Sequence, residues 1–183
     1  MVFDNHTHTT ISNLRLLDCI NDPIQLIDKA IELGLAGIAI TDHEALCAHM
    51  DVNEYAKKLQ ETHPEFTVAL GDEIYLTDTR DKGQKYYHFI LIAKDAIGHR
   101  CLRELSTKAW LNSYYDRGME RVPLLKDELK SIYSRFRGHL IATTACLGGE
   151  LGTAVLNLID CENALDTTNA QRYHNQIAVF LEY

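Results

Sequence analysis

Short apolar segments alternate along this chain with longer segments of helical periodicity, and this alternation limits the folds open to it. The apolar segments are four to eight residues long and rich in β-branched residues, which is typical of buried strands. Strands that alternate with helices predict a parallel sheet covered by helices, although the pattern does not choose between a barrel and an open sheet. The predicted strands are 37–41, 66–70, 86–93, 138–144 and a final one at 177–182; the predicted helices are 22–33, 52–62, 97–115, 123–133, one from 149 and another ending near 175.

A histidine pair stands at the start of the chain, in DNHTHTTISN at 4–13. Val2 and Phe3 indicate a strand, in which His6 and His8 would point to the same face. Two neutral imidazoles that close together can hold zinc, iron or manganese. The same spacing also suits two solvated histidines on an edge strand, and the pair alone leaves both readings open.

Polar side chains follow several of the predicted strands, where the active sites of parallel α/β proteins lie. Asp42 and His43 follow 37–41, Asp72 and Glu73 follow 66–70, and Cys146 follows 138–144. Each has an ordinary alternative, such as a helix cap for Asp42 or a small buried residue for Cys146. Together they predict a set of nitrogen, oxygen and sulfur donors at one rim.

The remaining histidines divide into one candidate and five others. His88 falls near the start of its strand, on the face of Ile90 and Ile92, and could be a core residue or could point to the same centre. The others lie in helices, turns or polar contexts and are predicted to be surface residues: His49, His63, His99, His139 and His174.

Composition excludes several classes of protein. The chain has 183 residues, of which 46% are hydrophobic and 24% charged, as in an ordinary globular domain. It has no apolar run of membrane-spanning length and no signal peptide, and its five cysteines lack paired spacings, so we expect a cytoplasmic protein. A net charge of −8 argues against a general nucleic-acid binder. The segment 100–137 differs, with nine Lys/Arg against five Asp/Glu.

Six segments occur in an order that resembles the polymerase-and-histidinol-phosphatase (PHP) family. They are NHTHT, LLD, GIAITDHEAL, GDEIYL, YYHFILIAK and LIATTACLGGEL. The stretches LIAKDAIGHRCLRELSTKAWL and TTACLGGEL are similar to the PHP domains of bacterial DNA polymerase III alpha subunits. The resemblance implies a distorted seven-stranded β/α barrel with up to three metal ions at the strand ends.

The resemblance also implies a ligand set and its roles. Glu73 would bridge two ions, His43 and Glu73 would act in catalysis, and Asp42 would orient His43 from behind. Asp18 rests on the match of RLLDC, in a segment a few residues longer than the family pattern. Zinc, manganese and iron suit such donors better than magnesium. The implied ligands are His6, His8, Asp18, His43, Glu73, His88 and Cys146.

One departure from the family concerns the end of the chain. The family completes its site with an Asp-x-His pair, and none occurs after Cys146. We therefore expect a single PHP domain over 1–183 that stops before its last strands, binds fewer metal ions than the intact domain and, in isolation, is slow or inactive as an exonuclease. The resemblance implies a metal-dependent phosphoesterase carried by a replicative polymerase, with 3′–5′ exonuclease activity, the DNA 3′ end and the polymerase body as partners, and no membrane. The alternatives are a free-standing phosphatase of small phosphomonoesters and a catalytically silent scaffold.

Overall fold

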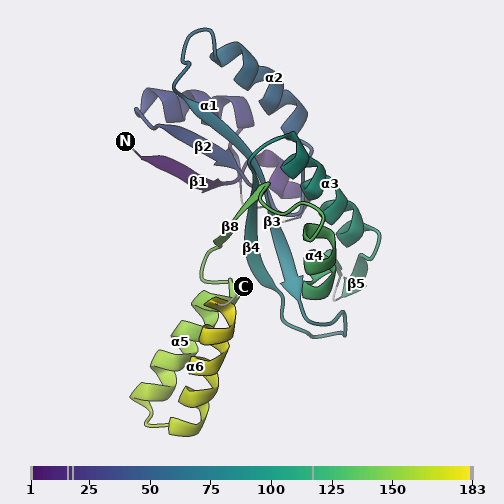
Figure 1. The fold of residues 1–183 in the computed structure, drawn as a ribbon, viewed down its shortest axis with the longest axis vertical. Coiled ribbons are helices and arrows are strands. Elements are labelled where there is room, and N and C mark those ends of the chain that lie inside the picture. The colour runs from purple at the N-terminus through teal and green to yellow at the C-terminus, as the bar shows by residue number, and fades with distance from the viewer. Residues whose placement is uncertain (1, 16, 18, 117, 182–183) are drawn as a thin grey trace.

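The computed structural model describes residues 2–15, 17, 19–116 and 118–181 (Figure 1). It is a mixed α/β fold in which a curled sheet carries helices. Within these residues the strands are β1 (Phe3–Thr7), β2 (Gly37–Ile40), β3 (Thr67–Thr77), β4 (Tyr87–Ala93), β5 (Tyr114–Asp116), β6 (Met119–Arg121), β7 (Pro123–Leu125) and β8 (Leu140–Thr144). The helices are α1 (Pro23–Glu32), α2 (His49–Leu59), α3 (Ala96–Trp110), α4 (Lys126–Tyr133), α5 (Glu150–Asn163) and α6 (Thr167–Leu181), with a 3-10 turn, η1, at Thr10–Leu14.

The main sheet has the order β1-β2-β3-β4-β8, and β7 also pairs with β3. Its first three strands are parallel, as predicted, but β4 runs antiparallel to both of its neighbours. The prediction of an entirely parallel sheet was therefore wrong. The segment between β3 and β4 contains no helix, and a parallel partner would need a crossover of a dozen or more residues.

Strand β3 extends well beyond the predicted end at residue 70 and joins two halves of the sheet. Its first residues pair with β2, from Thr67 to Leu70, and its later residues pair with β4, from Gly71 to Leu76. Gly71 lies at the change of partner, where a Cβ atom would come within 2.7 Å of the Leu91 carbonyl oxygen. Only glycine fits this close approach of two strands.

Two hydrophobic clusters lie on either side of that change of partner. Helices α1 and α2 cover the first half of the sheet, and α3 and α4 cover the second. The first cluster centres on Ile27, Ile38, Ile40, Val52 and Phe66. The second centres on Ile74, Leu91, Leu102, Leu105 and Leu124. Each half of the sheet is thus packed against its own pair of helices.

Residues 177–181 of the predicted strand at 177–182 are instead part of α6, which packs against α5 and projects from the sheet (Figure 1), and residue 182 lies outside the described residues. Asp166 marks the helix start, because its side chain accepts the backbone N–H of Asn169 at 3.1 Å. Gln176 ties α6 to α5 through Glu150 at 3.2 Å. The β-branched composition of the segment was misleading because α5 supplies an apolar helical partner.

Other boundaries differ from the prediction by a few residues. Helix α3 ends at Trp110, and the chain then forms the β5–β6 hairpin; α4 begins only after β7.

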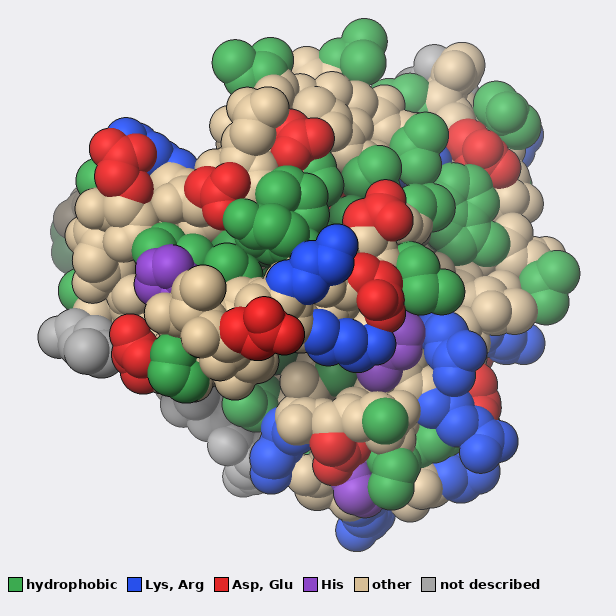
Figure 2. Space-filling view, turned by 90° about the horizontal axis from the view of Figure 1, so that it is seen from above, with side chains coloured by type: hydrophobic (Ala, Val, Ile, Leu, Met, Phe, Trp, Pro, Cys, Tyr) green, Lys and Arg blue, Asp and Glu red, His purple; other side chains and the backbone are tan. Residues whose placement is uncertain are grey.

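Basic side chains are concentrated toward one side of the face shown in Figure 2. In the part of the chain described, no helix is long and apolar enough to cross a membrane.

Candidate metal centre

Glu73 lies at the centre of the predicted site, in the middle of β3, with 1% of its surface exposed. Four imidazoles surround its carboxylate. Oε1 lies 2.7 Å from His88 Nδ1. Oε2 lies 2.9 Å from His43 Nδ1, 3.1 Å from His8 Nε2 and 3.8 Å from His6 Nε2. The structure therefore brings five of the seven predicted ligands together.

Backbone pairing places each of these side chains. His6 lies in β1, which pairs with β2, and His43 lies three residues after the end of β2, in a bridge opposite Glu73. Glu73 N donates to the Asp42 carbonyl oxygen at 3.0 Å, and Glu44 N donates to the Glu73 carbonyl oxygen at 3.1 Å. These two bonds hold His43 beside the carboxylate.

His88 reaches the same centre because β4 is antiparallel to β3. It stands opposite Tyr75, two residues beyond Glu73 and on the same face of β3. The backbone of His88 also contacts the loop that follows β8, because His88 N donates to the Gly148 carbonyl oxygen at 3.2 Å. Asp72, which was also predicted at this rim, precedes Glu73 in β3 and therefore points to the opposite face of the strand. It is fully buried and belongs to neither of the two donor groups described below.

The donor atoms form two groups that share Glu73. His6, His8 and Glu73 make one group, and His43, Glu73 and His88 make the other, with all ligand atoms of each group within 4.8 Å of one another. Imidazole nitrogens with a carboxylate are the donors that zinc, manganese and iron accept. The residues present therefore fit a pair of divalent ions bridged by one carboxylate.

Two hydroxyl groups set the tautomers of the first histidine pair. Ser12 Oγ donates to Asp42 Oδ1 at 2.7 Å, so it accepts from His8 Nδ1 at 3.0 Å. Thr41 Oγ1 donates to the Thr7 carbonyl oxygen at 3.1 Å and accepts from His6 Nδ1 at 2.8 Å. Both Nε2 atoms then face Glu73: with a proton, Nε2 of His8 can donate to the carboxylate at 3.1 Å, and without one it offers a lone pair to a metal ion. A divalent cation suits that arrangement.

Asp42 reaches His43 through Ser12, whose Oγ accepts from His43 N at 3.2 Å, and the prediction that Asp42 orients the His43 side chain stays a prediction. Asp42 is fully buried and accepts from Thr9 N at 2.6 Å, from Thr9 Oγ1 at 2.9 Å and from Ser12 Oγ. Its hydrogen bonds therefore hold the turn that carries Ser12, and it positions His8 through that hydroxyl. Sequence reasoning passed over Ser12 and Thr41, because a serine or threonine near a histidine motif carries no distinctive spacing.

The electrostatics of the centre follow from burial and from the crowding of imidazoles. Burial raises the pKa of Glu73, but hydrogen bonds with His43, His8 and His88 outweigh it and bring the pKa below its ordinary value. Burial lowers the pKa of His6, and nearby His8 and His43 lower it further against the attraction of Glu73. The site thus favours an ionised Glu73 carboxylate and a neutral His6, which is the state that metal binding requires of these two groups.

Two buried carboxyl groups lie beside the centre. Burial raises the pKa of Glu44 well above its ordinary value, and the neighbouring Asp72 raises it further. Burial likewise raises the pKa of Asp72, against a backbone hydrogen bond from Ala45. These two groups therefore favour the neutral form, whereas Glu73 favours the ionised form.

Of the two other predicted ligands, only Cys146 lies in the part of the chain described, and it touches the edge of this set. Cys146 is exposed, and its Sγ lies 3.7 Å from His88 Nδ1 and 3.3 Å from Gly148 N, outside both donor groups. Asp18 lies outside the described residues. A ligand role for Cys146 and Asp18 stays a prediction, as does metal binding by the five residues around the carboxylate.

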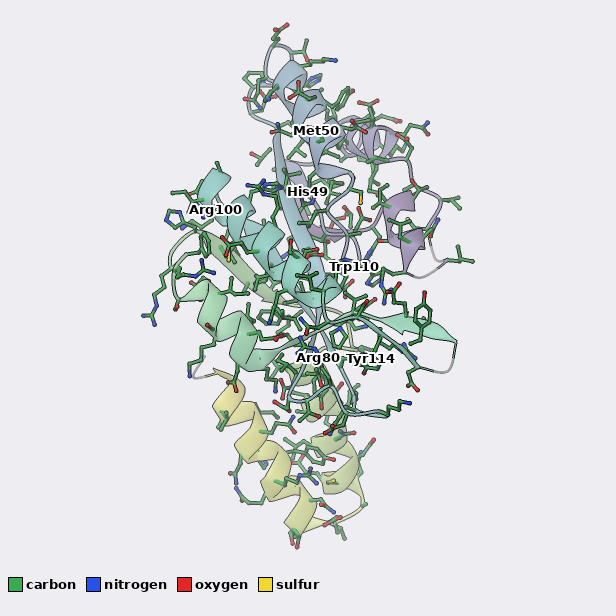
Figure 3. All side chains as sticks on the ribbon, turned by 90° about the vertical axis from the view of Figure 1, so that its right-hand side faces the viewer. His49, Met50, Arg80, Arg100, Trp110 and Tyr114 are labelled. Atoms are coloured by element: carbon green, nitrogen blue, oxygen red, sulfur yellow. The ribbon has the colours of Figure 1, made fainter. Side chains whose placement is uncertain are left out.

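The prediction that His49 is a surface residue was wrong. Its side chain is 3% exposed, its Nε2 lies 3.0 Å from the Gly71 carbonyl oxygen, and its Nδ1 lies 3.0 Å from His99 Nε2. Figure 3 shows His49 at the start of α2. The residue lies at a helix terminus, where sequence alone does not distinguish an inward from an outward side chain.

The model of the PHP domain family matches residues 4–183. The chain is 38% identical over 190 residues to the "Probable DNA polymerase YorL" of Bacillus subtilis strain 168, across 97% of this chain and 14% of that protein. It is 30% identical over 158 residues to the DNA polymerase III subunit alpha of Borreliella burgdorferi, across 82% of this chain and 12% of that protein.

Among solved structures, a protein from Bifidobacterium adolescentis described as a metal-dependent phosphoesterase aligns with a TM-score of 0.41 and 21% identity, over 61% of this chain and 35% of that one. The chain spans only 12% to 14% of the length of the two polymerases.

Proposed function

The chain belongs to the PHP domain family, and from that premise we propose that it is a metal-dependent phosphoesterase module that removes nucleotides from the 3′ end of DNA. The observation that carries the proposal is Glu73, shared by two groups of imidazole donors. A carboxylate between two ions is the arrangement that supports in-line displacement at phosphorus. The names of the relatives as DNA polymerases support DNA as the substrate.

Each residue of the site has a proposed task. When bound, a pair of zinc, manganese or iron ions would supply Lewis acidity and a more acidic water. Glu73 would hold both ions, and Ser12 and Thr41 would keep Nε2 of His8 and His6 available for them. His43, with a side chain 5% exposed, stands next to the carboxylate and away from bulk solvent. Catalytic roles for Glu73 and His43 follow from these positions, and Cys146 would join the set on the side of His88.

The setting of the module is part of the proposal. The polymerase relatives are much longer than this chain, which supports a partnership with polymerase domains and the 3′ end of a growing strand. Such a module would work in the cytoplasm, where replication takes place in bacteria. A role in proofreading during replication would follow from release of 3′ nucleotides.

Metal counting with single substitutions tests the shared carboxylate. Purified chain should retain two divalent ions by elemental analysis and release 3′ nucleotides from single-stranded DNA. Glu73→Gln should lose both ions and the activity, whereas His88→Gln should lose one ion, because His88 belongs to only one donor group. The matched control is Glu54→Gln, an exposed carboxylate on α2 with 56% of its side chain accessible.

Three results would count against the proposal. Equal metal content in wild type and Glu73→Gln would show that the ions bind elsewhere. Two bound ions without hydrolysis of any phosphoester would favour a silent scaffold. Rapid hydrolysis of a small phosphomonoester, with no release of nucleotides from DNA, would favour a free-standing phosphatase.

A further inference from the structure

A small cavity adjoins the candidate metal centre and shares His88 with it. Its volume is about 110 Å³, and its wall includes Arg15, Tyr75, Tyr86 and Arg121. Arg15 comes directly after η1, and Arg121 is the last residue of β6. Two cationic side chains from distant parts of the sequence therefore meet beside the carboxylate and its histidines.

Both guanidinium groups are held in place without a negative partner. Arg15 donates through NH2 to the Glu120 carbonyl oxygen at 2.7 Å and lies 5.4 Å from the centre of the Trp110 ring. Arg121 lies 5.4 Å from the centre of the Tyr86 ring. In the residues that the structure describes, no ion pair involves either arginine, and the buried Nε atom of each has no hydrogen-bond partner.

Such an arrangement is costly unless a ligand completes it. A buried donor without an acceptor destabilises the fold, and more so when the group is charged. Aromatic rings hold a guanidinium in a fixed direction without neutralising its charge. The two arginines are thus oriented for an oxyanion that bridges them, which guanidinium groups bind with paired hydrogen bonds.

The size of the cavity limits the anion. A cavity of roughly 150 Å³ holds a benzene ring, and this one is smaller, at about 110 Å³. It has room for a tetrahedral phosphate group and too little for a nucleoside. The sugar and base of any bound nucleotide would remain outside.

We propose that Arg15 and Arg121 bind a backbone phosphate of a nucleic-acid strand next to the phosphate that is hydrolysed. This inference rests on the proposed function and names its substrate class. Because the cavity is separate from Glu73 but shares His88, a substrate that fills both places must carry two phosphates. The site would therefore favour an oligonucleotide over a small phosphomonoester, and the arginines would act as specificity-determining residues.

Binding to metal-free protein tests the arginines apart from the metal centre. With chelator present, thymidine 5′-monophosphate should bind the 183-residue chain, and thymidine should not, in calorimetric titrations. Arg15→Gln and Arg121→Gln should each weaken binding about 10- to 100-fold, the usual loss of a hydrogen bond to a charged group. The matched control, Arg103→Gln, changes an exposed arginine on α3 and should bind like wild type.

The design separates this inference from the function on which it rests. Arg15→Gln and Arg121→Gln should keep the metal content of wild type, and Glu73→Gln should keep nucleotide binding in chelator. Circular dichroism identifies a variant that fails to fold, and Arg121→Lys, which retains the charge, should bind more tightly than Arg121→Gln. Equal binding of thymidine and its monophosphate, equal binding in Arg121→Gln and wild type, or binding only after metal is added would overturn the inference.

Discussion

Lowering the pH should destabilise the chain through His49, at the contact between α2 and α3. Its Nε2 donates to the Gly71 carbonyl oxygen, and its Nδ1 can then only accept, from His99 Nε2. Burial and the charge of His99 lower the pKa of His49, the hydrogen bond to the Gly71 carbonyl opposes them, and the resulting pKa is about 4. A proton on Nδ1 would break the contact with His99 and leave a charge inside the fold.

The sign and size of the effect follow from proton linkage. The ordinary pKa of histidine is 6.5. Between pH 6.5 and about pH 4, His49 therefore binds a proton in the unfolded chain but not in the folded chain. The contribution of His49 to the free energy of unfolding is therefore fully present above pH 6.5 and is lost as the pH drops toward 4. The difference between the two pKa values corresponds to about 3 kcal/mol.

Urea unfolding at several pH values measures this contribution. Wild type and His49→Gln should be unfolded between pH 7.5 and pH 4 in the presence of chelator, followed by circular dichroism. The free energy of unfolding should fall by about 3 kcal/mol more in wild type than in His49→Gln, because only wild type loses the histidine term. His174→Gln changes an exposed histidine and should follow wild type. Parallel pH profiles for wild type and His49→Gln would refute the reasoning.

Three further changes have distinct outcomes. Ser12→Ala should reduce the free energy of unfolding by about 1–3 kcal/mol and weaken zinc binding, since a buried carboxylate and an imidazole lose their shared hydroxyl; an unaltered zinc affinity would exclude a positioning role. Iodoacetamide should alkylate Cys146 more slowly with zinc than with chelator, and equal rates would remove it from the ligand set. Gly98→Ala should lower the free energy of unfolding in urea by about 1–3 kcal/mol, because the added Cβ would lie 2.0 Å from the His139 carbonyl oxygen. Gly152→Ala is the control, since its Cβ would have no contact closer than 3.5 Å and should leave that free energy unchanged.

The histidines and Glu73 could be identified from sequence because their positions depend on strand order and local spacing. His6 and His8 two residues apart, and His43 three residues after the end of a short apolar strand, lie where alternation and parallel pairing predict. The predicted α/β class is likewise confirmed. These features survive errors of several residues in the strand boundaries.

Features that depend on long-range packing could not be read in this way. The direction of β4 depends on a connection without a helix, and the continuation of β3 past Gly71 depends on a partner strand that exists only once β4 folds back. The helix α6 depends on α5 as its apolar partner. The roles of Ser12 and Asp42 depend on a turn that brings them together from 30 residues apart.

The long strand β3 also decides where this chain can gain or lose residues. The side chains of Glu73 and its neighbours in β3 point alternately to two buried faces of the sheet. Inserting or deleting one residue in the strand would move every later side chain to the opposite face. An insertion between Gly71 and Glu73 would aim the carboxylate away from all four imidazoles while leaving the composition of the site unaltered. The exposed loop that follows β3, at 78–86, carries no such constraint and can vary in length. Descendants of this sequence should therefore differ freely in that loop and hold the spacing from Gly71 to Glu73 constant.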